Sequence, residues 1–291
     1  PDLAAAVADA TAEPTDLLLI GYAQLAPYGQ GFPARLRVVD LHNVESTLAR
    51  RYGHLKGPIL GLPYALEARA LERIERRAVQ ESDMVLVVSE ADRQRLPKGG
   101  NIVVCPNGWD PGEPLPRSDQ AVVVFVALLG WAPNADAACW FVAEVWPLVR
   151  EGSSGARLLL VGRDPTPRVS ALATHDIEVT GTVPDVTPYL ARSRVALAPL
   201  RAGGGSRLKI LEALDAGRPV VATAIGVEGL EDLIGEGVVV ADEPQQMAEA
   251  ITGLLSDPAM AAELGERGHA AVKARHSWDN TLAPLLDRVG A

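Results

Sequence analysis

The sequence predicts an α/β fold with two doubly wound parallel sheets, one in each of two domains. Short apolar runs typical of strands alternate with helical segments along most of the chain, as in repeated βαβ units. The length of 291 residues and the hydrophobic content of 48% are sufficient for two cores of ordinary domain size. A proline-rich stretch near the middle separates the two halves.

The first domain is expected at residues 1–112, beginning with an Ala-rich helix at 2–13. Buried strands are expected at 16–21, 35–43, 84–89 and 101–110. Residues 64–82 predict a long helix with an ion pair between Glu72 and Arg76, four positions apart. The apolar side of this helix is expected to consist of Leu66, Ala70, Ile74 and Ala78. Ser89 is expected to cap the short helix that follows the third strand.

A linker is expected at 113–119, because residues 111–119 contain three prolines, charged residues and no apolar period. The second domain follows at 120–275, with strands at 121–129, 157–162, 177–181, 195–200, 219–223 and 237–241. Its main helices are expected at 134–149 (capped by Asn134), 185–194, 206–216, 244–256 and 258–275. A final segment, 276–291, contains a helix near 278–289. In a doubly wound domain the ligand site lies at the carboxyl ends of the strands.

The composition excludes several classes of function. The net charge of −10 and the pI near 5.0 argue against broad nucleic-acid binding and indicate no polybasic patch for anionic lipid. Cys105 and Cys139 fall in different predicted domains, without a disulfide or metal-binding pattern. No apolar run approaches the ~20 residues needed to cross a bilayer, and no signal peptide opens the chain. We therefore expect a cytoplasmic protein.

The stretch from Val195 to Thr223 predicts a strand, a glycine loop, a helix and a second strand. Gly203–Gly205 permit a sharp turn and close approach to a ligand, and Ser206 is expected to cap the helix. Arg207 and Lys209 fall in the first turn, where the helix dipole disfavours cations. A bound anion would reverse that effect, so the pattern predicts a diphosphate site.

Glu212 lies two turns beyond Gly205 on the same face of this helix. At ~1.5 Å per residue it is ~9 Å along the axis from Ser206, which suits hydrogen bonds to ribose hydroxyls when phosphates occupy the helix start. The alternative is an ordinary glycine-rich turn with two solvated cations and a glutamate that only favours the dipole. Spacing alone leaves both interpretations open.

Ordered motifs along the chain resemble one enzyme family. They are VVDLHNVES, VVCPNGWD, FVALLGWAPN, LLLVGRDP, IEVTGTVPDVTPYLARSRVALAPL, GGGSRLKILEALDAGRPVVAT and HSWD. Together they are similar to the retaining glycosyltransferases of family 4, often called glycosyl transferases group 1. The resemblance implies a GT-B fold, in which two Rossmann-like domains face a cleft, the second holds a nucleotide-sugar donor and the first holds the acceptor. It also implies that segment 276–291 packs back on the first domain, which is expected to be incomplete beside the longer N-terminal part of such enzymes.

The resemblance also assigns roles to individual residues. Glu212 matches the ribose-binding glutamate, and Arg207 and Lys209 fall where cations meet the diphosphate. His42 matches a histidine that reaches the donor sugar, with Asp40 and Glu45 as weaker candidates for orienting it or contacting the acceptor; the alternative is a packing or capping histidine. Further donor contacts are expected from Gly162, Gly181, Val183, Gly203, Gly204, Gly205, Ser206 and Leu208.

Two positions depart from the family pattern. Gly204 stands where many relatives have a glutamate that contacts the donor sugar, so backbone amides of the glycine loop are expected to supply those contacts. Ala127 stands where the first donor-domain loop often has a glycine, and this loop lacks the basic pair that many relatives use on the diphosphate. The diphosphate role therefore passes to Arg207 and Lys209.

The reaction implied by the resemblance is transfer of a hexosyl unit from a nucleoside diphosphate sugar to an acceptor hydroxyl, with retention of anomeric configuration. No cofactor and no metal are expected, because a helix dipole and basic side chains take the charge of the leaving diphosphate. The acceptor is expected to be a glycan, a lipid-linked molecule or a small molecule. No nucleic-acid partner and no transmembrane segment are expected, and peripheral contact with the inner face of the membrane is possible. Two alternatives are a non-catalytic nucleotide-sugar-binding subunit or scaffold and a GT-B nucleotide-sugar epimerase, although the acidic groups an epimerase needs around the sugar have no place in this sequence.

Overall fold

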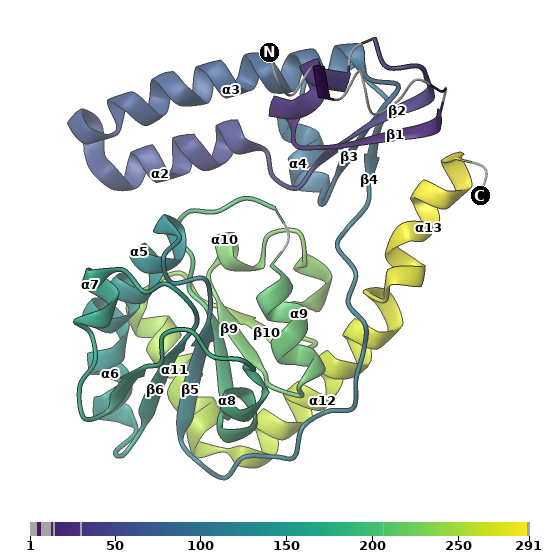
Figure 1. Ribbon diagram of the computed structural model, residues 1–291. Helices are drawn as coiled ribbons and strands as arrows, with labels where there is room; N and C mark the ends of the chain where they lie inside the picture. The colour runs from purple at the N-terminus through teal and green to yellow at the C-terminus, as the bar shows by residue number, and fades with distance from the viewer. Residues whose placement is uncertain (1–4, 7–12, 14, 30, 206, 290–291) are drawn as a thin grey trace. The chain divides into compact units, whose positions relative to one another are not determined.

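The computed structural model describes residues 5–6, 13, 15–29, 31–205 and 207–289, in two compact units (Figure 1). The first unit comprises Pro1–Asn107, Gly204–Ser206 and Thr281–Ala291, and the second comprises Gly108–Gly203 and Arg207–Asn280. Most of the helix expected at 2–13 lies outside the described residues, as does Ser206. Each unit contains one parallel sheet, which confirms the predicted α/β class.

The sheet of the first unit has the order β1-β2-β3-β4, with every pair of neighbours parallel. Its strands are β1 Thr15–Gly21, β2 Ala34–Leu41, β3 Met84–Val87 and β4 Ile102–Val104. The connections are the 3-10 helix η1 Ala23–Gly29, the pair α2 Glu45–Leu60 and α3 Leu62–Glu81, and α4 Glu90–Arg95. All four strands occur where the apolar runs predict them, and Ser89 caps α4 by accepting from the Asp92 amide at 3.0 Å.

The apolar side predicted for α3 is wrong in its first half. Leu66 is 57% exposed, and Ala70 is exposed as well. Ile74 and Ala78 do pack with the strands of this unit. The reason is that the first half of α3 runs beside α2 alone and has no sheet beneath it (Figure 1). The predicted Glu72–Arg76 ion pair is present at 4.0 Å.

The C-terminal helix α13, Trp278–Val289, contributes to the first unit from Thr281 onwards. Leu285 packs against Val38, Met84, Leu86 and Val103 on one face of the sheet. The Cys105 thiol lies 3.5 Å from the carbonyl oxygen of Thr281. At the other end of this contact, Arg288 donates to the side chain of Asn101 at 2.9 Å.

The sheet of the second unit has the order β10-β9-β8-β5-β6-β7 and is parallel throughout. Its strands are β5 Val122–Val126, β6 Arg157–Val161, β7 Ile177–Val179, β8 Val195–Ala198, β9 Val220–Ala222 and β10 Val238–Val240. Numbered within the unit this is the 3-2-1-4-5-6 order of Rossmann-like domains. The helices are α5 Ala132–Trp140, the π-helical η2 Phe141–Val145, α6 Trp146–Gly152, α7 Pro167–Ser170, α8 Thr187–Arg192, α9 Leu208–Asp215, α10 Ala224–Val227, the 3-10 helix η3 Glu231–Leu233, α11 Pro244–Ser256 and α12 Pro258–Arg275.

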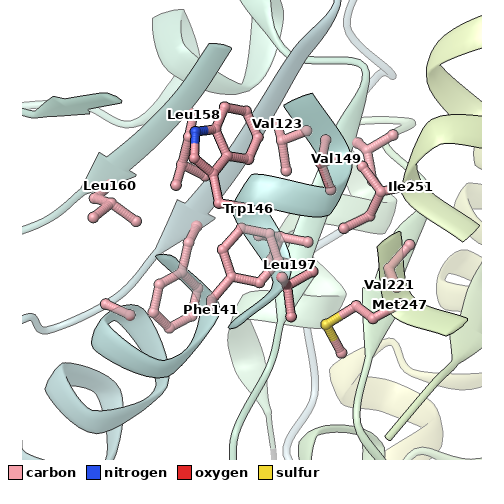
Figure 2. Close-up of a cluster of buried hydrophobic side chains, with 14 of the residues drawn as sticks. Val123, Phe141, Trp146, Val149, Leu158, Leu160, Leu197, Val221, Met247 and Ile251 are labelled. Atoms are coloured by element: carbon pink, nitrogen blue, oxygen red, sulfur yellow. The ribbon is translucent and has the colours of Figure 1, made fainter. Parts of the chain in front are cut away.

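Two apolar cores cover the two faces of this sheet, because alternate strand residues point to opposite sides. Val123 and Phe125 of β5 join the core formed with α5, α6 and α11. Trp146, Phe125 and Phe141 are the largest buried side chains of this core, and Figure 2 shows Val123, Phe141 and Trp146 within it. Val122 of the same strand joins the other core, formed with α8, α9, α10 and α12. Strands buried on both faces explain the continuous apolar runs in the sequence.

Two predicted helix starts in this unit are wrong. The helix expected to be capped by Asn134 begins at Ala132, with Trp131 at the N-cap and Pro133 in its first turn. The helix expected from Ser206 begins at Leu208, with Arg207 at the N-cap in a non-helical conformation (φ −103°, ψ 72°). Arg207 therefore precedes the first turn, and only Lys209 lies within it.

Candidate functional site

Strands β5 and β8 lie side by side in the sheet of the second unit. The chain leaves β5 towards α5 and α6 on one face of the sheet, and it leaves β8 towards α9 on the opposite face. In open parallel sheets this reversal separates the loops that follow the two strands and forms the usual ligand site. The loops of this unit are residues 127–131 after β5 and 199–203 after β8.

Gly162 allows the loops after β5 and β6 to pack backbone against backbone. Its φ is +147°, and a Cβ at this position would overlap the carbonyl oxygen of Ala127. The Ala127 amide donates to the Val161 carbonyl at 2.9 Å, and the Leu129 amide donates to the Arg163 carbonyl at 3.1 Å. Gly162 thus allows the loops after β5 and β6 to lie in direct backbone contact.

Arg207 is buried at the start of α9, with 4% of its surface exposed. Its guanidinium lies against Gly203, where an added Cβ would be 2.6 Å from Nη2. The same Nη2 donates to the carbonyl oxygen of Ile225 at 3.1 Å. A side chain at 203 would therefore displace the guanidinium from its present position, a contact that the sequence pattern did not indicate.

Lys209 is held from two sides in the first turn of α9. Its Nζ donates to Oδ1 of Asn134 at 2.8 Å and lies 4.8 Å from the ring centre of Phe125. The Asn134 amide is itself oriented, because its Nδ2 donates to the carbonyl oxygen of Leu128 at 3.0 Å. Burial, and after it the nearby Arg207, lowers the pKa of Lys209 to about 7, against the opposing effect of Glu212.

Glu212 lies one turn beyond Lys209 on α9 and is partly buried. Burial is the main cause that raises the pKa of this carboxyl, and the charge of Asp185 acts in the same direction. Asp185 follows the loop that contains Gly181, which has φ +68°, and Val183, which packs on the core beneath α9. Glu212 therefore lies within electrostatic reach of Asp185, which follows the loop that is predicted to face the nucleobase.

His42 follows the end of β2 in the first unit, and its side chain is 42% exposed. Its Nδ1 lies 3.6 Å from a carboxylate oxygen of Asp40. Its ring packs edge-on against the Tyr22 ring, with 4.9 Å between the two ring centres. Burial raises the pKa of Asp40, and His42 opposes this rise. Glu45 does not orient His42 through a hydrogen bond in the structure; it accepts instead from the Asn43 side chain at 3.2 Å.

Gly204 and Gly205 belong to the first unit, unlike Gly203. Gly205 has φ +69°, and a Cβ here would overlap the carbonyl oxygen of His42. A Cβ at Gly204 would lie 3.3 Å from Oδ1 of Asn43. Leu208, the first residue of α9, is 44% exposed.

Sequence reasoning missed two side chains at the carboxyl ends of β5 and β8. Arg201 forms a bidentate pair with Asp136, at 2.8 and 3.0 Å, and its guanidinium lies 5.6 Å from the ring centre of Trp140. Asn134, expected only as a helix cap, orients Lys209. Neither partner is near in the sequence, so no local motif indicates these contacts.

Comparison with known proteins finds relatives for the second unit. A family model described as glycosyl transferases group 1 matches residues 120–257. An exopolysaccharide phosphotransferase of Streptomyces coelicolor is 30% identical over 131 residues, which are 41% of this chain and 14% of that protein. A D-inositol 3-phosphate glycosyltransferase of Mycobacterium avium is 41% identical over 83 residues, 27% of this chain and 19% of that protein. The matched segments thus span less than a fifth of these curated relatives.

The likeness to solved structures extends over the whole chain. The Anabaena protein HepE, solved in complex with UDP-glucose, superposes with a TM-score of 0.75 at 17% identity, covering 100% of this chain and 82% of HepE. With the two parallel sheets, this likeness identifies the fold as GT-B. The family model and the curated glycosyltransferase relatives thus make this chain similar to glycosyltransferases over part of its length. Within the described ranges, no helix is long and apolar enough to cross a membrane.

Proposed function

We propose that this chain transfers a hexosyl unit from a nucleoside diphosphate sugar to an acceptor hydroxyl, with retention at the anomeric carbon. The observation that carries the proposal is the pair of neighbouring cations, Arg207 and Lys209, at the start of α9. A bound anion would stabilise two like charges that lie beside each other and are partly desolvated. A diphosphate at the end of β8 and the start of α9 supplies that anion.

The donor is proposed to lie along α9. Arg207 and Lys209 bind the diphosphate, Glu212 accepts from the ribose hydroxyls, and the loop containing Gly181 and Val183 faces the nucleobase. The two cations stabilise the charge that develops on the diphosphate as the glycosidic bond breaks, which is the main electrostatic contribution available to such a reaction. A diphosphate oxygen then helps to deprotonate the acceptor hydroxyl from the same side of the sugar. We propose that no metal takes part, because these cations neutralise the leaving group.

The role of His42 in positioning the donor sugar comes from the family resemblance. Its exposed ring beside Asp40 is compatible with hydrogen bonding to a sugar hydroxyl. A His42→Gln variant keeps a hydrogen-bonding amide in place of the imidazole ring, whereas His42→Ala removes both ring nitrogens and leaves no hydrogen-bonding group. If His42 positions the sugar, Ala lowers kcat more than Gln does and leaves the affinity for UDP unchanged.

The proposal is tested by donor turnover with UDP-, GDP- and dTDP-hexoses against glycan, lipid-linked and small-molecule acceptors, with product anomers assigned by NMR. The Arg207→Ala, Lys209→Ala double variant should lose about 10²- to 10³-fold in kcat per donor removed, as when one preorganised donor is lost. Lys273→Met, which changes an exposed lysine of α12, is the matched control. Normal turnover by the double variant would refute the assignment of the cations.

A second candidate is a nucleotide-sugar-binding subunit without catalysis, favoured by Gly204 at the position of the family glutamate. It predicts UDP binding by calorimetry that depends on Arg207 and Lys209, but neither donor hydrolysis nor transfer in the presence of EDTA or added Mg²⁺. Product formation with any donor excludes this candidate. Metal-independent turnover additionally supports the diphosphate role of the two cations.

A further inference from the structure

The connection between α2 and α3 carries an unusual apolar surface. Ile59, Leu60 and Leu62 are 84%, 69% and 59% exposed, which are the highest values for large apolar side chains among the described residues. Leu66, on the first turn and a half of α3, is 57% exposed. We call these four residues the α2–α3 tip. The tip lies where the two helices of this pair meet, away from the strands of the first unit (Figure 1).

Two glycines lie in close backbone contact at the α2–α3 connection, and we call this contact the glycine seam. Its members are Gly53 and Gly61, whereas Gly57, at φ +80°, has nothing within 4 Å of an added Cβ. A Cβ at Gly53 would lie 2.9 Å from the Cβ of Tyr64, and one at Gly61 would lie 2.6 Å from the carbonyl oxygen of Gly57. The backbones of α2 and α3 therefore approach too closely to hold large side chains between them. The apolar side chains beyond the seam have no core to enter.

The charge around the tip differs from that of the whole chain. Residues 46–66 contain no Asp or Glu but include Arg50, Arg51 and Lys56, although the net charge of the chain is −10. Arg50 pairs with Glu72 of α3 at 2.5 Å, and the Lys56 ammonium lies 4.7 Å from the ring centre of Tyr52. The segment is thus locally cationic, and Glu45 and Glu67 border it on either side.

We propose that the α2–α3 tip is a docking surface for an anionic lipid bilayer. Exposed Ile and Leu side chains enter the boundary between headgroups and acyl chains, and flanking cations bind anionic headgroups; this is how peripheral helices attach without spanning the membrane. A protein partner fits less well, because a stable interface buries about 800 Å² on each side with a larger apolar centre than four side chains on a protruding turn. The proposal does not depend on the glycosyl transfer reaction.

The test is co-sedimentation of the protein with vesicles of phosphatidylcholine alone or with 30% phosphatidylglycerol. One variant is Ile59→Ser, Leu60→Ser, Leu62→Ser, and its matched control is Ile234→Ser, Met260→Ser, which changes exposed apolar residues of the second unit. A second variant is Arg51→Gln, Lys56→Gln, with Lys98→Gln, Lys273→Gln as control. Far-UV circular dichroism and thermal unfolding of each variant, measured separately, report whether it is folded.

We expect binding to the anionic vesicles that exceeds binding to the neutral ones and weakens with salt. The serine variant should bind at least ~100-fold more weakly, and the glutamine variant about 25-fold more weakly, at roughly fivefold per cation. Both controls should bind like the original protein. Equal partitioning of the original protein and the serine variant would overturn the proposal, and so would a dimer in sedimentation equilibrium that the serine variant converts to a monomer without any vesicle binding.

Discussion

Binding of a diphosphate should be coupled to uptake of a proton by Lys209. Burial and Arg207 lower the pKa of this ammonium to about 7 in the structure. A phosphate charge at ~4 Å contributes about 4 kcal/mol at the effective dielectric near a protein surface, enough to return the pKa most of the way to the ordinary lysine value. The lysine is therefore mostly neutral at pH 8 before binding and charged after it.

The magnitude follows from the lowered pKa. At pH 8 a group with a pKa of about 7 is ~10% protonated, so binding should take up about 0.9 proton; at pH 6 it should take up only about 0.1. The affinity for UDP should fall about fivefold from pH 7 to pH 8 for the same reason. The phosphates of UDP contribute little to this proton uptake at pH 8, because the terminal phosphate ionises with a pKa near 6.

The assay is isothermal titration calorimetry of UDP in buffers of different ionisation enthalpy, at pH 6 and pH 8. Lys209→Met should abolish the proton uptake at pH 8, whereas Lys273→Met should retain it. The unfolding free energy of the empty protein should also rise as pH rises from about 7 to 10.5, because the unfolded chain keeps a proton that the folded lysine has lost. Equal uptake in the original protein and in Lys209→Met would refute the reasoning.

Three further predictions concern buried contacts. Asn134→Asp places a carboxylate beside Lys209, so it should raise the lysine pKa, reduce proton uptake in the same calorimetric experiment and weaken UDP binding; unchanged uptake would contradict it. Gly162→Ala should lower the free energy of unfolding, measured by urea denaturation, by about 3 kcal/mol or more. The reason is that the added Cβ would overlap the Ala127 carbonyl oxygen at a residue with positive φ. Glu75→Ala should cost about 3 kcal/mol, since it leaves the buried amide and hydroxyl of Ser46 without their acceptor, whereas the exposed Glu72→Ala should cost under about 0.5 kcal/mol.

Most strands could be predicted from the sequence, but one long helix could not. The strands of the second unit are apolar on both faces, so runs such as Val122–Val126 stand out without any alternation. Helix α2 was not predicted, because Gly53, Gly57 and Pro58 interrupt its pattern and few of its residues are buried. At the start of α2, the free backbone amide of Ser46 donates to the Glu75 carboxylate at 2.9 Å. Glu75 lies on α3, 29 positions further along the chain.

The parts of the candidate site that follow local rules were visible in the sequence, and those that depend on sheet order were not. The cations near the end of a glycine loop suggested an anion site. The partners of Lys209 and Arg201 are Asn134 and Asp136, which follow another strand. They become neighbours only because β8 pairs with β5, an arrangement that no local pattern specifies. The sequence also did not indicate that α9 begins at Leu208, with Arg207 at the N-cap in a non-helical conformation.

The loop after β7 has a consequence for how specificity could change. β7 is an edge strand of three residues, and nothing lies within 4 Å of a Cβ added at Gly181. Replacing or lengthening this loop leaves the anchoring of Arg207 to Ile225 and of Lys209 to Asn134 untouched. Under the proposed function, base preference and leaving-group affinity belong to separable pieces of chain, and we expect that grafting one short loop would change the donor nucleotide.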